Sequence, residues 1–236
     1  MIQDRLTGKA QLARLSNARR PPTQLLYGIA FEHFCKFFLT HYCHLEVRGT
    51  LPATTSPFLV CSNHRSHLDS LAILIATGLP FTSCGLLAAQ DYFFRNPIWL
   101  RLLTPAMHLI PVSRRPRPHE FQSMVDSCAD FLRDGGRALI AYPEGTRSNA
   151  AGLSTFKRGA AVLALRLGLP VLPIFVSGTD HVLPKQRIIP RPGRILVRVG
   201  SLLHFNQAAQ PANLRNYSLQ VAKEIETRVG SLNSQS

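Results

Sequence analysis

The sequence predicts one α/β domain: a mixed, partly parallel sheet flanked by helices, with an amphipathic helix at the N-terminus. First, a chain of 236 residues suits a single domain and is long enough to bury a hydrophobic core. Second, short apolar segments alternate with longer segments of helical periodicity, a pattern typical of α/β sheets. Third, no internal repeat, low-complexity segment or linker indicates a second domain.

This alternation defines the expected elements in chain order. Strands are expected at residues 44–49, 57–62, 82–88, 107–113, 137–142, 170–177 and 194–203. Helices are expected at residues 24–43, 67–77, 96–104, 119–134, 157–167 and 211–229. The last strand alternates less cleanly than the others, which predicts a place at the edge of the sheet. The chain therefore divides into a basic and amphipathic segment (1–45), a main domain (46–230) and a disordered tail (231–236).

The first expected helix carries an aromatic stripe. At about 100° per residue, one arc of the helix contains Tyr27, Phe31, Phe34, Cys35, Phe38 and Tyr42. Such a stripe suits either the interface of a bilayer or the domain's own core, and periodicity does not separate the two. Charged residues interrupt the apolar segment 24–44, so it is not an uninterrupted membrane span. The aromatic and basic segment 92–100 is a second candidate for membrane contact.

The chain is strongly basic, with 27 Lys and Arg against 13 Asp and Glu and a formal net charge of +14. This surplus predicts a polyanionic partner: nucleic acid, an anionic membrane surface or an acidic carrier protein. Nucleic acid is not expected, since zinc-finger spacing, RNP signatures and heptad repeats are lacking. Five cysteines without a CxxC pair predict reduced thiols and no metal site. Residues 1–22 have no apolar region typical of a secretory signal peptide.

A histidine and an aspartate lie between the second expected strand and the helix that follows it. His64 is on the loop that leaves the strand, and Asp69 is in the first turn of the helix. A carboxylate that accepts a hydrogen bond from one imidazole nitrogen leaves the other nitrogen available as a general base. The nucleophile is then a substrate hydroxyl, as in acyl transfer. A structural hydrogen bond or a helix cap would give the same pattern, and His67 is a rival base.

A second polar segment, residues 142–148, follows the fifth expected strand. Gly145 allows a tight turn near a ligand. Arg147 offers a planar set of donors suited to phosphate, and Thr146 adds a hydroxyl. Lys157 adds a cation where the next helix begins, a position that favours anion binding. The alternative interpretation is a polar loop with solvated charges.

Together these segments resemble the glycerolipid acyltransferase family, whose best-known members acylate lysophosphatidic acid. In family order, the matching blocks are Asn63, His64 and Asp69; Ile110 to Arg114; Pro143 to Ser148; Phe156, Lys157 and Gly159; and Pro170 to Ile174. The resemblance covers roughly residues 57–178. Tyr142 replaces the usual Phe, and His108 replaces the Gly usually found six positions before Arg114.

The resemblance implies transfer of a fatty acyl group from acyl-CoA or acyl carrier protein to the free hydroxyl of a lyso-glycerolipid. The expected acceptor is 1-acyl-sn-glycerol 3-phosphate, with phosphatidic acid as product and no cofactor or metal. Residues 46–230 then form an acyltransferase domain. Backbone N–H groups near His64 or the loop glycines are expected to stabilise the oxyanion. Catalysis is assigned to His64 and Asp69. Acceptor binding is assigned to Arg114, Glu144, Gly145, Thr146, Arg147 and Lys157.

Alternative functions are another acceptor (glycerol 3-phosphate or a non-phosphate lyso-lipid) and a non-catalytic, basic lipid-binding protein. The absence of a G-x-S-x-G elbow argues against a serine hydrolase, and the absence of a P-loop or G-x-G-x-x-G argues against a nucleotide-dependent enzyme. Because the implied acceptor is a lipid, the aromatic stripe is expected to contact an anionic membrane surface. The protein is expected on the cytosolic face of a membrane, as a peripheral or monotopic protein.

Overall fold

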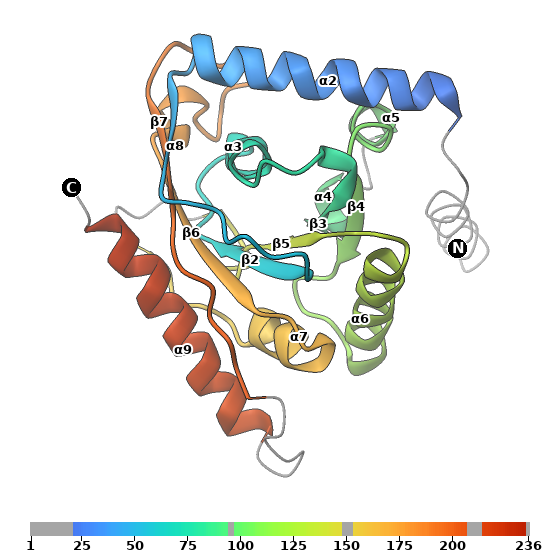
Figure 1. Ribbon diagram of the computed structural model, residues 1–236, viewed down its shortest axis with the longest axis vertical. Coiled ribbons are helices and arrows are strands. Elements are labelled where there is room, and N and C mark those ends of the chain that lie inside the picture. The colour runs from blue at the N-terminus through green and yellow to red at the C-terminus, as the bar shows by residue number, and fades with distance from the viewer. Residues whose placement is uncertain (1–20, 94–96, 148–152, 207–213, 235–236) are drawn as a thin grey trace.

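The central sheet has seven strands in the order β1-β7-β6-β2-β5-β3-β4 (Figure 1). The computed structural model describes residues 21–93, 97–147, 153–206 and 214–234. Its strands are β1 (Leu45–Arg48), β2 (Phe58–Ser62), β3 (Cys84–Ala89), β4 (His108–Val112), β5 (Ala138–Ala141), β6 (Val171–Ser177) and β7 (Ile195–Val199). Neighbouring strands are parallel except β6 and β7, which are antiparallel. The predicted mixed, partly parallel sheet is therefore confirmed.

The prediction that the last strand lies at the edge of the sheet is wrong. β7 lies between β1 and β6 and pairs with both. Its side chains do alternate, because Ile195, Val197 and Val199 are buried and the residues between them are only partly buried. The predicted range continued to residue 203, and the residues after Val199 lie outside this strand.

Helices cover both faces of the sheet and correspond to all six predicted segments. They are α2 (Pro22–His41), α3 (Leu68–Ala76), α5 (Pro97–Leu103), α6 (Pro118–Arg133), α7 (Gly159–Leu167) and α9 (Leu214–Asn233). In Figure 1, α2 and α3 lie on one side of the sheet, and α6, α7 and α9 lie on the other. Three shorter segments were not predicted: η1 (Phe81–Ser83), α4 (Gln90–Phe93) and α8 (Thr179–Val182). None exceeds four residues, too few for a helical period.

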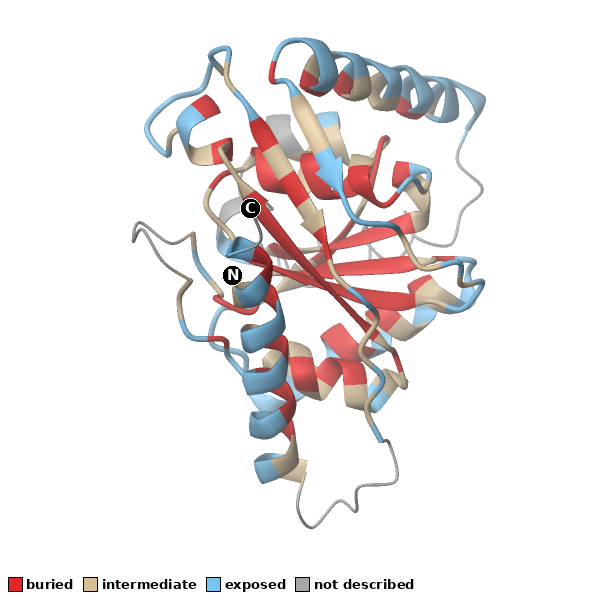
Figure 2. Ribbon diagram, turned by 60° about the vertical axis from the view of Figure 1, so that its left-hand side comes forward, coloured by how far each residue is buried: buried red, intermediate tan, exposed pale blue. Residues whose placement is uncertain are grey.

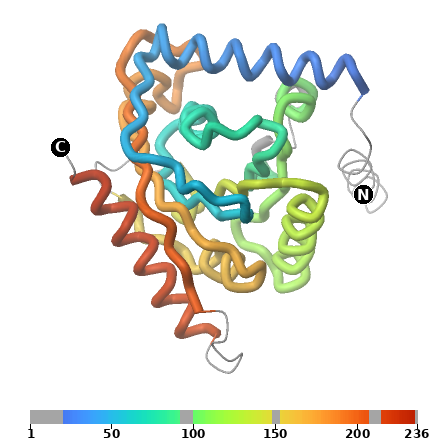
Figure 3. Tube along the Cα trace, viewed as in Figure 1, coloured from blue at the N-terminus to red at the C-terminus, as the bar shows by residue number. Residues whose placement is uncertain are grey.

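The C-terminal helix continues past its predicted end. α9 runs to Asn233, so the disordered tail expected from residue 231 is wrong for residues 231–233. Leu232 explains the extension, because its side chain is buried in the core layer that α9 shares with α7 and β6. Figure 3 shows α9 lying along the outside of the sheet.

The hydrophobic core forms two layers, one on each face of the sheet. Phe58 and Val60 of β2 belong to the layer beneath α2 and α3, whereas Leu59 and Cys61 belong to the layer beneath α6, α7 and α9. Successive side chains of a strand point to opposite faces, which produces this division. All five residues of β2 are buried, and the central strands are red in Figure 2. The loop that leaves β2 therefore starts from the most enclosed part of the molecule.

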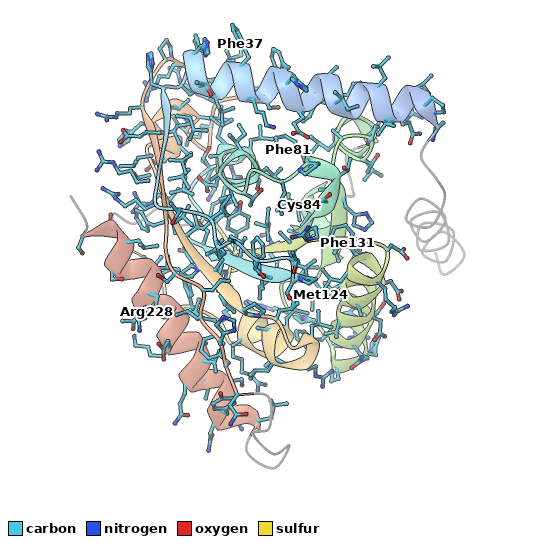
Figure 4. All side chains as sticks on the ribbon, viewed as in Figure 1. Phe37, Phe81, Cys84, Met124, Phe131 and Arg228 are labelled. Carbon is cyan, nitrogen blue, oxygen red and sulfur yellow. The ribbon has the colours of Figure 1, made fainter. Side chains whose placement is uncertain are left out.

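α2 packs one side against the domain. Cys35 and Leu39 are buried there, and Phe31 and Phe38 pack against the same core while partly buried. Gly28 permits close packing, because a Cβ atom at this position would lie 3.0 Å from the carbonyl oxygen of Pro105. The opposite side is exposed, and Figure 4 shows Phe37 there, pointing away from the domain. We call this side the outer face of α2; its exposed apolar residues are Leu25, Leu26, Ile29, Phe34 and Phe37.

The predicted aromatic stripe therefore does not form a single exposed face. Besides the buried members, Tyr27 and Tyr42 donate hydrogen bonds to the carbonyl oxygens of Leu102 (3.0 Å) and Pro190 (3.3 Å). The expectation that the whole stripe contacts a membrane is wrong. α2 is apolar on most of its circumference, so its periodicity does not reveal which side the domain covers. Among the described residues, no helix is both long and apolar enough to cross a membrane.

Some predictions concern residues that the structure does not describe. The basic N-terminal residues 1–20 lie outside the described ranges, as does Ser148 of the second site segment. The side chains of residues 92–99 are also outside the description, and they make up most of the second candidate membrane contact. These predictions remain untested.

Candidate active site

The two predicted site segments leave neighbouring strands at the same edge of the sheet. β2 and β5 are parallel, with Cys61 opposite Ala141 in the register. The first segment directly follows β2, and the second directly follows β5. Both therefore lie at the carboxyl ends of parallel strands, where α/β proteins commonly bind ligands.

His64 and Asp69 form a hydrogen-bonded pair. The Nδ1 atom of His64 lies 2.9 Å from Oδ2 of Asp69. The carboxylate is completely buried and also accepts hydrogen bonds from the backbone N–H groups of Arg65 (2.6 Å) and Ser66 (2.8 Å). The hydroxyl of Thr179, at the start of α8, donates to its Oδ1. With Nδ1–H donated to this fixed carboxylate, Nε2 is the nitrogen of His64 that is left for a substrate.

A tyrosine covers one face of the His64 ring. The rings of His64 and Tyr142 are stacked, with centroids 4.0 Å apart and an angle of 17° between their planes. The Tyr142 hydroxyl is hydrogen-bonded to that of Ser70 over 2.7 Å. Burial, and then the charge of Asp69, raise the pKa of Tyr142 well above its ordinary value, so its hydroxyl stays protonated. Sequence analysis noted Tyr142 only as a replacement for Phe and did not identify Ser70.

Asn63 fixes the position of the loop after β2. Its buried side chain donates to the carbonyl oxygen of Val176 (2.7 Å) and accepts from the N–H of the same residue (2.8 Å). A side-chain amide has both a donor and an acceptor, so that of Asn63 pairs with both the carbonyl and the N–H of Val176 in β6. The Ser66 hydroxyl adds a bond to the carbonyl oxygen of Leu183 (2.8 Å). The loop that carries His64 is thereby held to β6 and to the segment after α8.

Glu144 connects the two site segments. Its side chain accepts hydrogen bonds from the N–H of His64 (2.8 Å) and from the N–H of Ser154 (3.2 Å), and it is only 4% exposed. Gly145 has a φ of +76°, and a Cβ there would lie 2.6 Å from Nζ of Lys157. The backbone conformation therefore favours glycine, and the missing Cβ leaves room for the present position of the Lys157 side chain.

A cavity of about 910 Å³ opens beside these groups. Six predicted site residues line it: His64, Arg114, Gly145, Thr146, Arg147 and Lys157. Asp69 and Glu144 lie behind the lining, where they position His64. Arg114 lies near Asp91, with 3.4 Å between Nε and Oδ1. The structure thus brings all eight predicted residues to one place.

His67, the rival base, also lines the cavity. Burial, and then the electrostatic interactions with Arg147 and His64, lower the pKa of His67 to about 4, although Asp69 opposes this effect. His67 is therefore neutral at neutral pH, and a base with so low a pKa takes up a proton poorly. The imidazole of His64 is hydrogen-bonded to Asp69.

The backbone N–H groups expected to stabilise an oxyanion are already engaged. Those of His64, Arg65 and Ser66 donate to carboxylates, and that of Gly145 donates to the carbonyl oxygen of Tyr142 (3.0 Å). The expectation for these groups is therefore wrong. It failed because local sequence does not show which N–H groups the neighbouring carboxylates occupy.

None of the five cysteines lines this cavity. All five cysteines are buried free thiols. Burial raises the pKa of Cys35 to about 12 and that of Cys84 to about 11. Among the described residues, no cluster of three or more His, Cys, Asp or Glu side chains is suited to hold a metal ion.

Solved structures show the same fold. The 1-acyl-sn-glycerophosphate acyltransferase PlsC of Thermotoga maritima matches with a TM-score of 0.64, covering 97% of this chain and 89% of that protein. The two sequences are 21% identical, so the likeness concerns the fold alone.

Sequence relatives bear the names of acyltransferases. The 1-acyl-sn-glycerol-3-phosphate acyltransferase alpha of Mus musculus is 30% identical over 192 residues, which cover 78% of this chain and 65% of that protein. The 1-acyl-sn-glycerol-3-phosphate acyltransferase of Pseudomonas aeruginosa is 28% identical, and the match covers 78% of this chain and 70% of that protein. A chloroplastic 1-acyl-sn-glycerol-3-phosphate acyltransferase from Arabidopsis thaliana is 29% identical, and the match covers 77% of this chain and 51% of that protein. The chain thus spans about half to two thirds of the length of most of these relatives.

The acyltransferase family, finally, matches residues 44–177, which is more than half of the chain and includes both site segments. This range contains His64, Asp69 and the 143–147 loop that the structure brings together around the cavity. The chain belongs to the acyltransferase family.

Proposed function

We propose that this protein transfers a fatty acyl group to the free hydroxyl of 1-acyl-sn-glycerol 3-phosphate, which yields phosphatidic acid. The observation that carries the proposal is the His64–Asp69 pair, 2.9 Å apart, beside a cavity lined by cations. The names of the mouse and Pseudomonas aeruginosa relatives support this acceptor. The acyl donor is acyl-CoA or acyl carrier protein, both of which are thioesters.

His64 acts as the general base in this reaction. Its Nε2 accepts the proton of the acceptor hydroxyl while the hydroxyl oxygen attacks the thioester carbonyl. Collapse of the tetrahedral intermediate breaks the carbon–sulfur bond, and the proton passes from His64 to the leaving thiolate. Asp69 stabilises the imidazolium that exists between these two transfers.

Cations on the cavity wall hold the acceptor's phosphate. Arg147 and Lys157 lie on the loop after β5 and at the start of α7, and both line the cavity with His64. A guanidinium group matches the geometry of a phosphate with two parallel hydrogen bonds. Arg114 is a third cation, and the Thr146 hydroxyl also faces the cavity.

Side chains stabilise the oxyanion, because the nearby backbone N–H groups donate to other partners. The donors among the cavity-lining side chains near His64 include Ser70, Thr146 and Arg147. The Ser70 hydroxyl is held in place by Tyr142, which is the kind of fixed dipole that favours a developing negative charge.

The acceptor is a lipid, so the protein lies on the cytosolic face of an anionic membrane. The outer face of α2 is apolar and exposed, and α2 ends beside the loop that follows α8 (Figure 1). In that loop, Ile188 and Ile189 are 85% and 79% exposed between basic residues. Exposed apolar groups beside cations suit the headgroup region of an anionic bilayer. The five free thiols agree with a reducing compartment.

An acylation assay tests this proposal. Purified protein is incubated with a panel of lyso-lipids and glycerol 3-phosphate, with labelled acyl-CoA or acyl carrier protein as donor, and the products are identified. We expect phosphatidic acid from 1-acyl-sn-glycerol 3-phosphate. His64→Ala should reduce its rate by roughly 10²–10⁴-fold, whereas His67→Ala should retain most of it.

Two outcomes would contradict the proposal. Loss of activity in His67→Ala, with activity retained in His64→Ala, would show that the base is misassigned. Vesicle binding without turnover of any acceptor would identify a non-catalytic lipid-binding protein. Circular dichroism spectra of both variants establish that the fold is intact.

A further inference from the structure

The cavity contains more positive charge than one acceptor phosphate needs. Among the described residues that line it, the one carboxylate is that of Glu120, which accepts a hydrogen bond from the N–H of Arg117 at the start of α6. The cationic residues of the lining are Arg114, Arg147, Lys157, Arg158, Arg166 and Arg215. Three of them, Arg158, Arg166 and Arg215, have no role in the mechanism proposed above.

These three arginines extend along α7 and onto the start of α9. Arg158, Val162 and Arg166 are spaced four residues apart, so they share one side of α7, and all three line the cavity. At 1.5 Å per residue, Arg158 and Arg166 are separated by about 12 Å along the helix axis. Arg215, in the first turn of α9, lines the same cavity. The cavity therefore has positive charge well beyond the loop after β5.

Arg166 is positioned by two neighbours on α6. Its guanidinium donates a hydrogen bond to the side-chain oxygen of Gln122 and lies 5.9 Å from the centre of the Phe121 ring. Both neighbours also line the cavity. Within the described ranges, Arg158, Arg166 and Arg215 form no salt bridge with an Asp or Glu side chain. Their charge is thus available to an anionic ligand.

We propose that Arg166 and Arg215, together with Arg158, bind the phosphate groups of the CoA part of the acyl donor. This inference rests on the acyl transfer proposed above. The thioester has to reach His64, but a long uncharged pantetheine arm separates it from the phosphates of CoA. A second group of cations, which begins at Arg158 next to Lys157 and extends to Arg166 and Arg215 in the same cavity, satisfies that requirement. Guanidinium groups bind phosphates with paired hydrogen bonds.

The test compares two donors with the same thioester and pantetheine arm, of which only acyl-CoA has the phosphorylated nucleotide. Arg166→Gln/Arg215→Gln is assayed with acyl-CoA and with acyl-pantetheine, which has the same thioester but no phosphate. With acyl-CoA, the KM for the donor should rise about tenfold or more, since two charge-assisted contacts are lost. The KM for the lyso-lipid should stay unchanged. With acyl-pantetheine, the variant and the wild type should have equal KM values.

A matched control removes two arginines elsewhere. Arg133→Gln/Arg228→Gln lowers the net charge by the same amount, at exposed ion pairs on α6 and α9. This control should leave the donor KM unchanged. An equal rise in the control would attribute the effect to overall charge and overturn the inference.

Other results separate this inference from the function on which it rests. If wild-type protein acylates the lyso-lipid and the double variant has an unchanged KM for acyl-CoA, only the donor site is wrong. The donor site is also wrong if the KM defect persists with acyl-pantetheine, or if acyl carrier protein is the only donor used. If wild-type protein produces no acylated lipid from any donor, the proposed function itself fails.

Discussion

Three contacts fix the imidazole of His64, and each uses a different part of the residue. Asp69 bonds Nδ1, Glu144 accepts the backbone N–H, and Tyr142 covers the face of the ring. Asp69 belongs to α3, whereas Glu144 and Tyr142 belong to the loop after β5. The ring therefore has one orientation relative to both segments. An imidazole held in this way needs no rearrangement of the site to act as the proposed base.

Arg147→Ala should separate acceptor binding from catalysis. Loss of a charge-assisted contact to the phosphate costs about 1.5–3 kcal/mol, so the KM for lysophosphatidic acid should rise about 10–100-fold. The KM for acyl-CoA should move much less. Steady-state kinetics with both substrates measure this difference. A lyso-lipid without phosphate is the control, because the substitution should not affect its KM. If only the donor KM rose, Arg147 would belong to the donor site.

His67 should make the protein less stable in mild acid. Its pKa is lowered to about 4 in the folded protein, mainly by burial, whereas an unfolded chain has the ordinary value of about 6.5. Between these values the unfolded chain binds more protons, so the free energy of unfolding decreases as the pH falls. His67→Gln removes this titration and should flatten the decrease by about 1–3 kcal/mol.

Urea unfolding of wild-type protein and His67→Gln, from about pH 7 to about pH 4.5, tests this prediction. Because other groups titrate in both proteins, only the difference between the two curves reports on His67. A difference that does not vary with pH would mean that folding does not lower the pKa of His67.

Local spacing predicted the His64–Asp69 pair, because one strand-to-helix loop carries both residues. Their other partners lie far away in the sequence. Thr179 is 110 positions from Asp69, and Val176 is 113 positions from Asn63. The hydrogen-bonded hydroxyls of Ser70 and Tyr142 are 72 positions apart. Such contacts depend on which strands become neighbours. Hydrophobic periodicity identifies strands but does not give their order, so these partners could not be predicted.

Among the elements, the seven strands were predictable because apolar runs mark them clearly. The position of β7 was not, since it pairs with β1, which is far earlier in the chain. α2 shows the same limit for helices. Its sequence is apolar on several sides, and only the packing of Cys35 and Leu39 shows which side the domain covers.

Neighbouring residues of α2 should respond differently to the same substitution. Phe37 is 64% exposed, whereas Phe38 packs against the core. Phe37→Asp should weaken binding to anionic vesicles about tenfold or more, because it removes apolar surface available to the bilayer. Its free energy of unfolding should be unchanged. Phe38→Asp should instead lower that free energy by roughly 3 kcal/mol.

Vesicle sedimentation and urea unfolding of both variants provide the two measurements. Each variant is the control for the other, since the introduced charge is the same. Unchanged vesicle binding of Phe37→Asp would exclude the outer face of α2 from the membrane contact. The search would then move to residues 92–100.

At the scale of the whole molecule, the proposed membrane contact combines an apolar and an electrostatic component at one end. The outer face of α2 supplies apolar surface, and the loop after α8 supplies Ile188 and Ile189 together with Lys185 and Arg187. A hydrogen bond between Tyr42 and Pro190 holds this loop at the end of α2. α9, which bears Arg228, lies away from this end (Figure 4). The net charge of +14 therefore does not by itself define the membrane contact. The position of the charged residues on the molecule also matters.

Lys185→Gln/Arg187→Gln should therefore reduce the affinity for anionic vesicles at low salt by about 30-fold, since each cation near such a surface contributes about 1 kcal/mol. In about 1 M salt, where the Debye length is about 3 Å, wild type and variant should bind equally. Lys223→Gln/Arg228→Gln on α9 removes the same two charges at exposed positions and should bind like the wild type at every salt concentration. Equal losses in both double variants would show that net charge governs binding. The loop after α8 would then not face the membrane.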